Sequence, residues 1–210
     1  MHEVDPSYMG FSPDDRPVAD VAAWRLNERK RLIEERKCLS SVNRENLSRS
    51  IALNLDDVLG DVTRKVISLY WPFLGEPDLR GWMSAAATRG ATCSLPVVVG
   101  KGQPLVFRTW RFGEPLERGV WNIPVPSQGK EVRPDIVIAP VVGFDADGFR
   151  LGYGGGFFDR TLALLQPSPL VVGVGFELQK IETIHPLHHD IPMDYIVTDV
   201  AVHRPSTHRE

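Results

Sequence analysis

The stretch Asp135-Ile136-Val137-Ile138-Ala139-Pro140-Val141-Val142 is the most apolar run of the chain. Such a run fits a strand that is covered on both faces, which is the usual place of a central strand in a parallel sheet. Outward from it, residues 66–71 and 92–95 are shorter apolar runs on either side of a helical pattern at residues 79–89. A strand, a helix and a strand in this order form a βαβ unit, whose strands pair in parallel.

The remaining apolar patterns complete the predicted fold. Further strands are expected at residues 105–112, 170–176 and 195–200, and a helix is expected at residues 159–165. Residues 121–126 contain two prolines and predict a rigid loop. The sequence therefore predicts an α/β fold, a three-layer sandwich with a mostly parallel central sheet covered by helices on both faces.

Two amphipathic helices are predicted before the first strand, at residues 20–37 and 41–59. In the first helix, Ala22, Leu26 and Ile33 recur at the spacing of a core-facing stripe. Arg25 and Arg29 stand four residues apart, so their guanidinium groups point to the same side. On residue types alone, this pair belongs to a solvated face with neighbouring glutamates.

The composition is that of an ordinary globular protein, with 42% hydrophobic and 24% charged residues and a net charge of -3. This charge gives no reason to expect non-specific binding to nucleic acid, so we expect no nucleic-acid partner. No apolar run approaches membrane-spanning length, and the first residues lack the apolar core of a signal peptide. Cys38 and Cys93 lack zinc-binding spacing. We expect a cytoplasmic monomer or weak homo-oligomer without a membrane partner, with a flexible extension at residues 1–19 and one domain at residues 20–205.

A glycine-rich stretch follows the central strand, Arg150-Leu151-Gly152-Tyr153-Gly154-Gly155-Gly156-Phe157-Phe158-Asp159-Arg160. Such a backbone can place several N–H groups at a helix N-terminus, where phosphate binds well. The stretch lacks the Lys-Ser/Thr ending of a P-loop, and Phe157 stands where the third glycine of a dinucleotide fingerprint would fall. A packing turn between helix and sheet explains the glycines equally well.

Few other residues point to chemistry. Asp159 and Asp190 are carboxylates that suit Mg²⁺ beside a phosphate site, although Asp159 is as easily a helix-start residue. His185, His188 and His189 share a loop but lack a third ligand at helical spacing, so a transition metal is not favoured. No Gly-x-Ser-x-Gly motif or reactive cysteine offers a nucleophile.

Read together, these residues resemble the 5-formyltetrahydrofolate cyclo-ligase family, also called 5,10-methenyltetrahydrofolate synthetases. The resemblance rests on the pattern Gly143-Phe144-Asp145 followed by Gly148-x-Arg150-Leu151-Gly152-x-Gly154-x-Gly156-x-x-Asp159. Four further markers occur in the family's order: residues 70–76, Leu95-Pro96, Trp121-Asn122-Ile123-Pro124, and His189-Asp190-x-x-x-Asp194-x-x-x-Thr198.

The resemblance implies an enzyme that uses ATP and Mg²⁺ to convert 5-formyltetrahydrofolate to 5,10-methenyltetrahydrofolate, with ADP and phosphate as the other products. In the family's mechanism the γ-phosphate passes to the formyl oxygen, N10 of the folate attacks the activated carbon, and phosphate departs. Such a reaction needs no covalent nucleophile, in agreement with the residues present, because phosphoryl transfer depends mainly on positioning and charge stabilisation.

The resemblance also implies the role of each site residue. The ATP phosphates would be bound by Arg25, Arg29, Arg150, Gly152, Tyr153, Gly154, Gly155, Gly156, Phe157 and Phe158. Arg150 and Asp159 would act in catalysis, and Asp159 and Asp190 would hold Mg²⁺. Glu76 would bind the pterin edge, with Trp121 and Phe158 against the folate ring system.

The chain departs from the family pattern at a few positions. Phe157-Phe158 replaces the more usual Tyr-Tyr, Val125 stands where Gln or Glu is expected, and Arg25 stands where the family has Lys. These departures leave two alternatives open: a non-catalytic folate- or nucleotide-binding relative, and an ATP-dependent kinase or ligase for another small molecule. The matching folate-side positions, Glu76 and Trp121, favour the cyclo-ligase.

Overall fold

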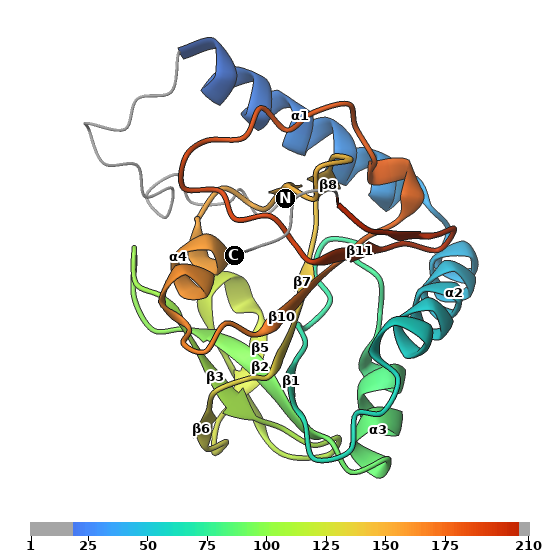
Figure 1. The fold of residues 1–210 in the computed structure, drawn as a ribbon, viewed down its shortest axis with the longest axis vertical. Coiled ribbons are helices and arrows are strands. Elements are labelled where there is room, and N and C mark those ends of the chain that lie inside the picture. Colours follow the sequence, from blue (N-terminus) through green and yellow to red (C-terminus); the bar gives the residue numbers. More distant parts are fainter. Residues whose placement is uncertain (1–18, 206–210) are drawn as a thin grey trace.

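The computed structural model describes residues 19–205, so the extension predicted at residues 1–19 lies outside the described residues except for Ala19, which begins the first helix. A large sheet forms the centre of the described chain, in the order β12-β11-β10-β7-β1-β2-β3-β6 (Figure 1). Its strands are β1 (Val66–Ser68), β2 (Thr92–Val98), β3 (Leu105–Thr109), β6 (Glu131–Val132), β7 (Ile136–Pro140), β10 (Leu170–Val174), β11 (Tyr195–Val197) and β12 (Val202–His203). All neighbours from β11 through β2 pair in parallel, whereas β12, β3 and β6 pair antiparallel with their neighbours.

Helices cover both faces of this sheet. The α-helices of residues 19–205 are α1 (Ala19–Cys38), α2 (Ser41–Leu59), α3 (Arg80–Thr88) and α4 (Phe157–Leu164). Ile138 of β7 belongs to the hydrophobic cluster that contains Ile51 of α2 and Trp82 of α3. The next residue along the strand, Ala139, belongs instead to the cluster that contains Leu162 of α4. Because successive side chains of a strand point to opposite faces, α2 and α3 lie on one face and α4 on the other, which confirms the predicted three-layer fold.

Helix α1 lies across the end of the sheet at which the parallel strands finish (Figure 1). Its Leu32 packs with Val142 and Leu151, which follow β7 along the chain. The predicted core stripe was wrong at Leu26, which is 39% exposed, whereas Arg25 and Arg36 are buried. The reason is that this face of α1 packs against loops and not against an apolar sheet. The carboxylate and carbonyl groups of these loops accept hydrogen bonds from the arginines of α1.

The connections that follow the two neighbouring central strands, β1 and β7, lead in opposite directions along the sheet. β1 leads through α3 to β2 on one side, while its neighbour β7 leads through α4 to β10 on the other side. The loops that leave the carboxyl ends of β1 and β7 therefore turn away from each other. In open α/β sheets, ligands bind in the crevice that such a switch point leaves.

Several predicted boundaries were wrong. β1 ends at Ser68, because residues 70–76 turn over the crevice, and β11 ends at Val197, where the Thr198 hydroxyl bonds the backbone of a turn into β12. Helix α4 begins at Phe157, directly after the left-handed Gly156. Residues 121–126 are only in part a loop, because β5 (Pro124–Pro126) pairs with β4 (Leu116–Arg118). This two-stranded ribbon tolerates proline because each strand has a free edge.

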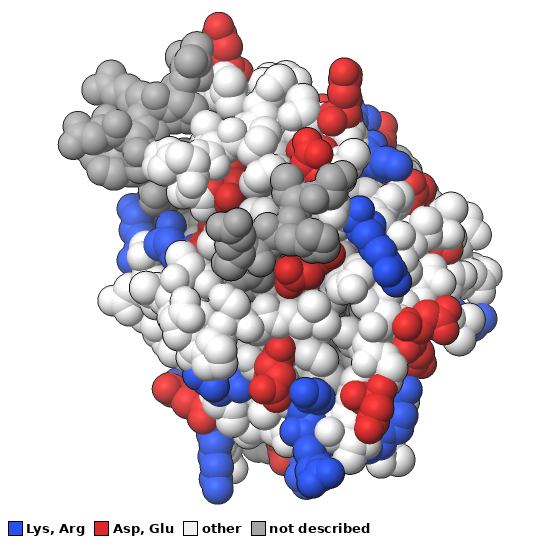
Figure 2. Space-filling view, viewed as in Figure 1, with Lys and Arg blue, Asp and Glu red and all other residues white. Residues whose placement is uncertain are grey.

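Charges of both signs are interspersed over the face shown in Figure 2. Among residues 19–205, no helix is both long enough and apolar enough to span a membrane.

Candidate active site

A pocket of about 580 Å³ lies at the carboxyl ends of the parallel strands, over the switch point between β1 and β7. Pro140 at the end of β7 and Pro96 and Val98 of β2 form part of its wall. The structure brings every residue that the sequence singled out for phosphate, folate or Mg²⁺ to this pocket: Arg25, Arg29, Glu76, Trp121, Arg150, Gly152, Tyr153, Gly154, Gly155, Gly156, Phe157, Phe158, Asp159 and Asp190.

The glycine stretch connects the hairpin of β8 (Gly143–Phe144) and β9 (Arg150–Leu151) to the N-terminus of α4. Gly154 and Gly156 have φ of 92° and 61°, a region that residues with a Cβ rarely adopt. A Cβ at Gly152 would lie 2.6 Å from Nη1 of Arg150. The glycines thus permit both the turn and the close approach of an arginine to the backbone beside the pocket.

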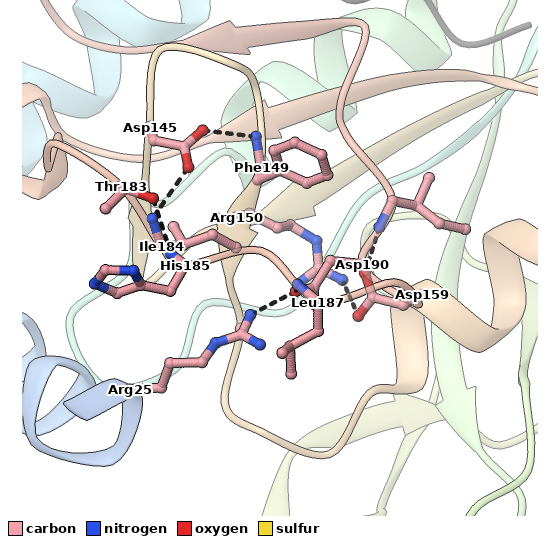
Figure 3. Close-up of polar contacts among 12 residues, drawn as sticks. Arg25, Asp145, Phe149, Arg150, Asp159, Thr183, Ile184, His185, Leu187 and Asp190 are labelled. Atoms are coloured by element: carbon pink, nitrogen blue, oxygen red, sulfur yellow. Dashed lines mark hydrogen bonds and ion pairs between the residues drawn. The ribbon is translucent and has the colours of Figure 1, made fainter. Parts of the chain in front are cut away.

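Arg150 and Asp159 pair across the ends of this stretch (Figure 3). Nη2 of Arg150 lies 3.2 Å from Oδ2 of Asp159, and the Arg150 side chain is only 4% exposed. The guanidinium also lies 5.0 Å from the centre of the Phe158 ring, within reach of a cation–π interaction. Oδ1 of Asp159 accepts a hydrogen bond of 3.4 Å from the backbone N–H of Ile191.

A second pair joins α1 to the loop at residues 184–192. Nη2 of Arg25 donates to Oδ2 of Asp190 at 2.9 Å, and the N–H of Leu187 donates to the same oxygen at 2.7 Å (Figure 3). Arg29 donates from Nε to the carbonyl of Gly152 at 2.8 Å. The expectation of a solvated basic face was therefore wrong for Arg25 and Arg29, which turn towards the glycine stretch and the Asp190 loop.

Positive charge is concentrated on this side of the pocket. Burial, and then the neighbouring charge of Arg25, lower the pKa of Arg29 to about 10. The Nε atoms of Arg25, Arg150 and Arg160 are buried and, within residues 19–205, have no hydrogen-bond acceptor. A ligand that carries several anionic oxygens would supply acceptors to these donors, so the arginine side of the pocket fits a polyphosphate.

The loop that carries Asp190 is held by a carboxylate outside the pocket. Oδ2 of Asp145 accepts from the N–H of Ile184 at 3.0 Å, and Oδ1 accepts from the N–H of Phe149 at 3.1 Å (Figure 3). The Gly143-Phe144-Asp145 motif thus ties the β8–β9 hairpin to the loop. We assign Asp145 a structural role in the site.

Another side of the pocket is apolar and aromatic. The Trp121 ring lies 6.3 Å from that of Tyr153 and 6.2 Å from that of Phe157, between centroids. Trp121 adopts a φ of 55°, an uncommon backbone region for a bulky residue, which indicates that the surrounding structure holds the backbone at this point. Val125 is buried and adds an apolar side chain to the wall.

Glu76 is the acidic group on this side, and it is 5% exposed. Burial raises the pKa of Glu76, while the charge of Arg36 and hydrogen bonds from Tyr153 and the Phe73 N–H oppose the rise. Sequence reasoning missed Arg36, which is fully buried. Its place seven residues after Arg29, on the same helical face, was a signal that could have found it.

The two aspartates do not form a metal site by themselves. Within the described residues, no group of three or more His, Cys, Asp or Glu side chains is arranged to hold a metal ion. Asp159 and Asp190 fit the usual mode of Mg²⁺, which binds one or two carboxylates and takes its other ligands from phosphate and water. His188 and His189 contact each other edge to face, and His185 contacts Trp24 in the same way.

Comparison with known proteins agrees with this architecture. The model of the 5-formyltetrahydrofolate cyclo-ligase family matches residues 21–199. The 5-formyltetrahydrofolate cyclo-ligase of Haemophilus influenzae is 28% identical over 164 residues, which cover 74% of this chain and 87% of that protein. The corresponding Escherichia coli K12 protein is 28% identical over 177 residues, which cover 80% of this chain and 97% of that protein.

Solved structures give the same result. The 5,10-methenyltetrahydrofolate synthetase of Aquifex aeolicus is 30% identical and superposes with a TM-score of 0.75, covering 89% of this chain and 95% of that one. The family match spans most of the chain, and the residues that carry the family pattern meet in one pocket. The chain belongs to the 5-formyltetrahydrofolate cyclo-ligase family.

Proposed function

We propose that this protein is a 5-formyltetrahydrofolate cyclo-ligase that uses ATP and Mg²⁺ to form 5,10-methenyltetrahydrofolate, ADP and phosphate. The observation that carries the proposal is the division of one pocket into two sides. One part of the lining carries Arg25, Arg150 and Asp159 with their ion pairs, and another carries Glu76 and Trp121, which both lie beside Tyr153. Family membership and the similarity to the named relatives support the same activity.

The arginine side is the proposed nucleotide subsite. Arg25, Arg29 and Arg150 bind the phosphate oxygens, and the glycine stretch allows the phosphates to approach the backbone. Asp159 and Asp190 would hold Mg²⁺, which when bound would neutralise charge on the phosphate oxygens. Each aspartate contacts an arginine, so the carboxylates and guanidinium groups hold one another in position at the proposed phosphate site.

The aromatic side is the proposed folate subsite. Glu76 accepts hydrogen bonds from the pterin edge, while Trp121 and Phe158 pack on the ring system. The γ-phosphoryl group passes to the formyl oxygen; N10 then bonds to the formyl carbon, the C–O bond breaks, phosphate leaves with that oxygen, and N10 loses its proton. The protein holds the formyl oxygen beside the arginine side, so its contribution is positioning and charge stabilisation.

The direct test mixes the purified full-length protein with 5-formyltetrahydrofolate, Mg²⁺ and ATP, and follows the methenyl product by absorbance. We expect product above a control without protein, with one ADP formed per methenyl group. Binding of 5-formyltetrahydrofolate without any product would contradict the proposal and support a non-catalytic binding protein. ADP formation only with another acceptor would support an ATP-dependent kinase or ligase for another small molecule.

The departures from the family pattern can be tested in the same assay. Phe157 and Phe158 lie against Arg160 and Arg150, at 5.5 Å and 5.0 Å between ring centre and guanidinium carbon. We propose that these rings hold the arginines and that the missing hydroxyls are dispensable, so Phe158→Tyr should leave kcat within about twofold.

We also propose that the enzyme acts in the cytoplasm, as a monomer or weak homo-oligomer.

A further inference from the structure

Tyr153 belongs to the glycine stretch, yet its side chain leaves the arginine side and reaches Glu76. Its hydroxyl donates to Oε1 of Glu76 at 2.7 Å and accepts from Nη2 of Arg36 at 2.8 Å. Burial and the charge of Glu76 hold the pKa of Tyr153 well above its ordinary value, so the hydroxyl keeps its proton. It therefore acts as a donor to the carboxylate.

The position of this hydroxyl is fixed by a buried arginine. Arg36 has no exposed surface, and it donates from Nε to the carbonyl of Leu74 at 3.0 Å and from Nη1 to the carbonyl of Val141 at 3.3 Å. These carbonyls belong to the loops that follow β1 and β7. A guanidinium held by both loops presents Nη2 to Tyr153 in one orientation.

The Glu76 carboxylate is in turn oriented by two donors from the protein. Oε1 accepts from Tyr153, and Oε2 accepts from the N–H of Phe73 at 2.9 Å. A carboxylate has about four lone-pair positions, so these two contacts leave acceptor positions for a ligand in the pocket. Loss of the Tyr153 hydroxyl would leave the carboxylate held by one donor and free to turn.

We propose that Tyr153 is a positioning residue for the folate subsite: its hydroxyl, anchored by Arg36, holds Glu76 in the orientation that accepts the pterin edge. The inference rests on the proposed function and extends it. The stretch that lines the proposed nucleotide side thereby also determines folate affinity, through the Tyr153 hydroxyl that reaches Glu76.

The ionisation of Glu76 gives this role a distinct signature. The titratable and charged groups near it are Arg36 from α1, Tyr153 from the glycine stretch and Tyr70 from the loop after β1. Among these, the Tyr153 hydrogen bond favours the ionised carboxylate and so lowers the pKa of Glu76. Removing the hydroxyl therefore raises the pKa of Glu76. As the solution is acidified, Glu76 is then protonated, and folate binding is lost, at a higher pH than in the wild-type protein.

The test is Tyr153→Phe in the full-length protein, which keeps the ring contacts with Phe73 and Trp121. We expect the KM for 5-formyltetrahydrofolate to rise about tenfold or more, because a hydrogen bond to a charged group is lost from the site. The KM for MgATP should rise by a smaller factor than the KM for folate, because the hydroxyl that is removed contacts Glu76 and Arg36 and not the arginine side of the pocket. The acid limb of the kcat/KM profile for folate should move to higher pH.

Two comparisons show whether Tyr153 acts through Glu76. In a Glu76→Gln background, Tyr153→Phe should change the folate KM by less than about twofold, because coupled residues are not additive. Tyr195→Phe is the matched control, since this tyrosine lies in β11 with its ring against Arg204 and does not line the pocket. It should leave both KM values and the pH profile unchanged.

The outcomes separate this inference from the proposed function. A wild-type enzyme that turns over 5-formyltetrahydrofolate, with an unchanged folate KM and pH profile in Tyr153→Phe, would overturn the positioning role and leave the function in place. An equal rise in both KM values would also overturn it, because it would indicate a general loss of loop structure. A wild-type protein that neither binds nor converts the folate would overturn both.

Discussion

Asp159 lies where the glycine stretch meets the loop at residues 184–192. It is in the first turn of α4, where a negative charge is favoured by the helix dipole, and its oxygens contact Arg150 and the backbone of Ile191. A helix-start role and a proposed metal-binding role are therefore compatible in one side chain. Substitution by Asn separates the two roles, because loss of the charge at the helix start lowers stability by only about 0.3–1 kcal/mol, whereas loss of a Mg²⁺ ligand weakens the use of MgATP.

We predict that Asp159→Asn raises the KM for MgATP by about tenfold or more, since the amide keeps the shape of the side chain but not the charge that Mg²⁺ requires. The dissociation constant for 5-formyltetrahydrofolate, measured without nucleotide, should not change. Asp147→Asn, at an exposed turn outside the pocket, is the matched control. An unchanged ATP dependence in Asp159→Asn would remove Asp159 from the metal role.

Gly156 combines two reasons for a glycine in this stretch, a left-handed backbone and a close neighbour. Its φ is 61°, and an added Cβ would lie 2.7 Å from Nη1 of Arg160. We predict that Gly156→Ala lowers the free energy of unfolding by about 1–2 kcal/mol. The measurement is denaturant unfolding followed by circular dichroism.

Gly81 is the control for this glycine. It lies in α3, with nothing within 4 Å of an added Cβ. Gly81→Ala should raise the free energy of unfolding by up to about 1 kcal/mol, because alanine favours the helix. Equal effects of the two substitutions would show that the left-handed turn at Gly156 is not what requires glycine there.

At the scale of elements, α1 shows where sequence reasoning reaches its limit. Its length and its place before α2 followed from the apolar pattern, but the direction of Arg25 and Arg29 did not. Their partners, Asp190 and the carbonyl of Gly152, lie more than a hundred residues away, so no local pattern reports them. Only the resemblance to a family assigned these arginines to the pocket.

The helix α2 shows the opposite case, because its limits of residues 41–59 were predicted from local signals alone. Oγ of Ser40 accepts from the N–H of Asn43 at 3.1 Å and so caps the helix. We predict that Ser40→Ala lowers the free energy of unfolding by about 1 kcal/mol, seen as a fall of about 2–4 °C in Tm. Ser41→Ala, at an exposed position in the first turn, should stay within about 0.5 kcal/mol. Similar losses in both variants would argue against capping.

For the whole molecule, the order of strands decides where the site lies. The apolar run at residues 135–142 predicted a central strand, and β7 has that place between β10 and β1. The strand order itself did not follow from the sequence, because pairing depends on contacts between distant segments. The pocket over the β1–β7 junction is therefore a result of topology that residue patterns could not supply.

Residues 20–205 are proposed to form one domain, and unfolding tests this. We predict a single calorimetric transition whose calorimetric and van't Hoff enthalpies agree. A non-hydrolysable ATP analogue with Mg²⁺, at a hundred times its dissociation constant, should stabilise the protein by about 2.7 kcal/mol. Two transitions, with only one shifted by the analogue, would contradict a single domain.

The edges of the sheet bear on how the protein behaves at high concentration. Within residues 19–205, the outermost strands of the sheet, β6 and β12, are two residues long each. An open edge of this length offers few unpaired backbone groups to a strand from another chain, and short edge strands are one way in which natural sheets avoid aggregation. Substitutions that lengthen β6 or β12 with β-branched residues would therefore promote fibril formation without changing the pocket.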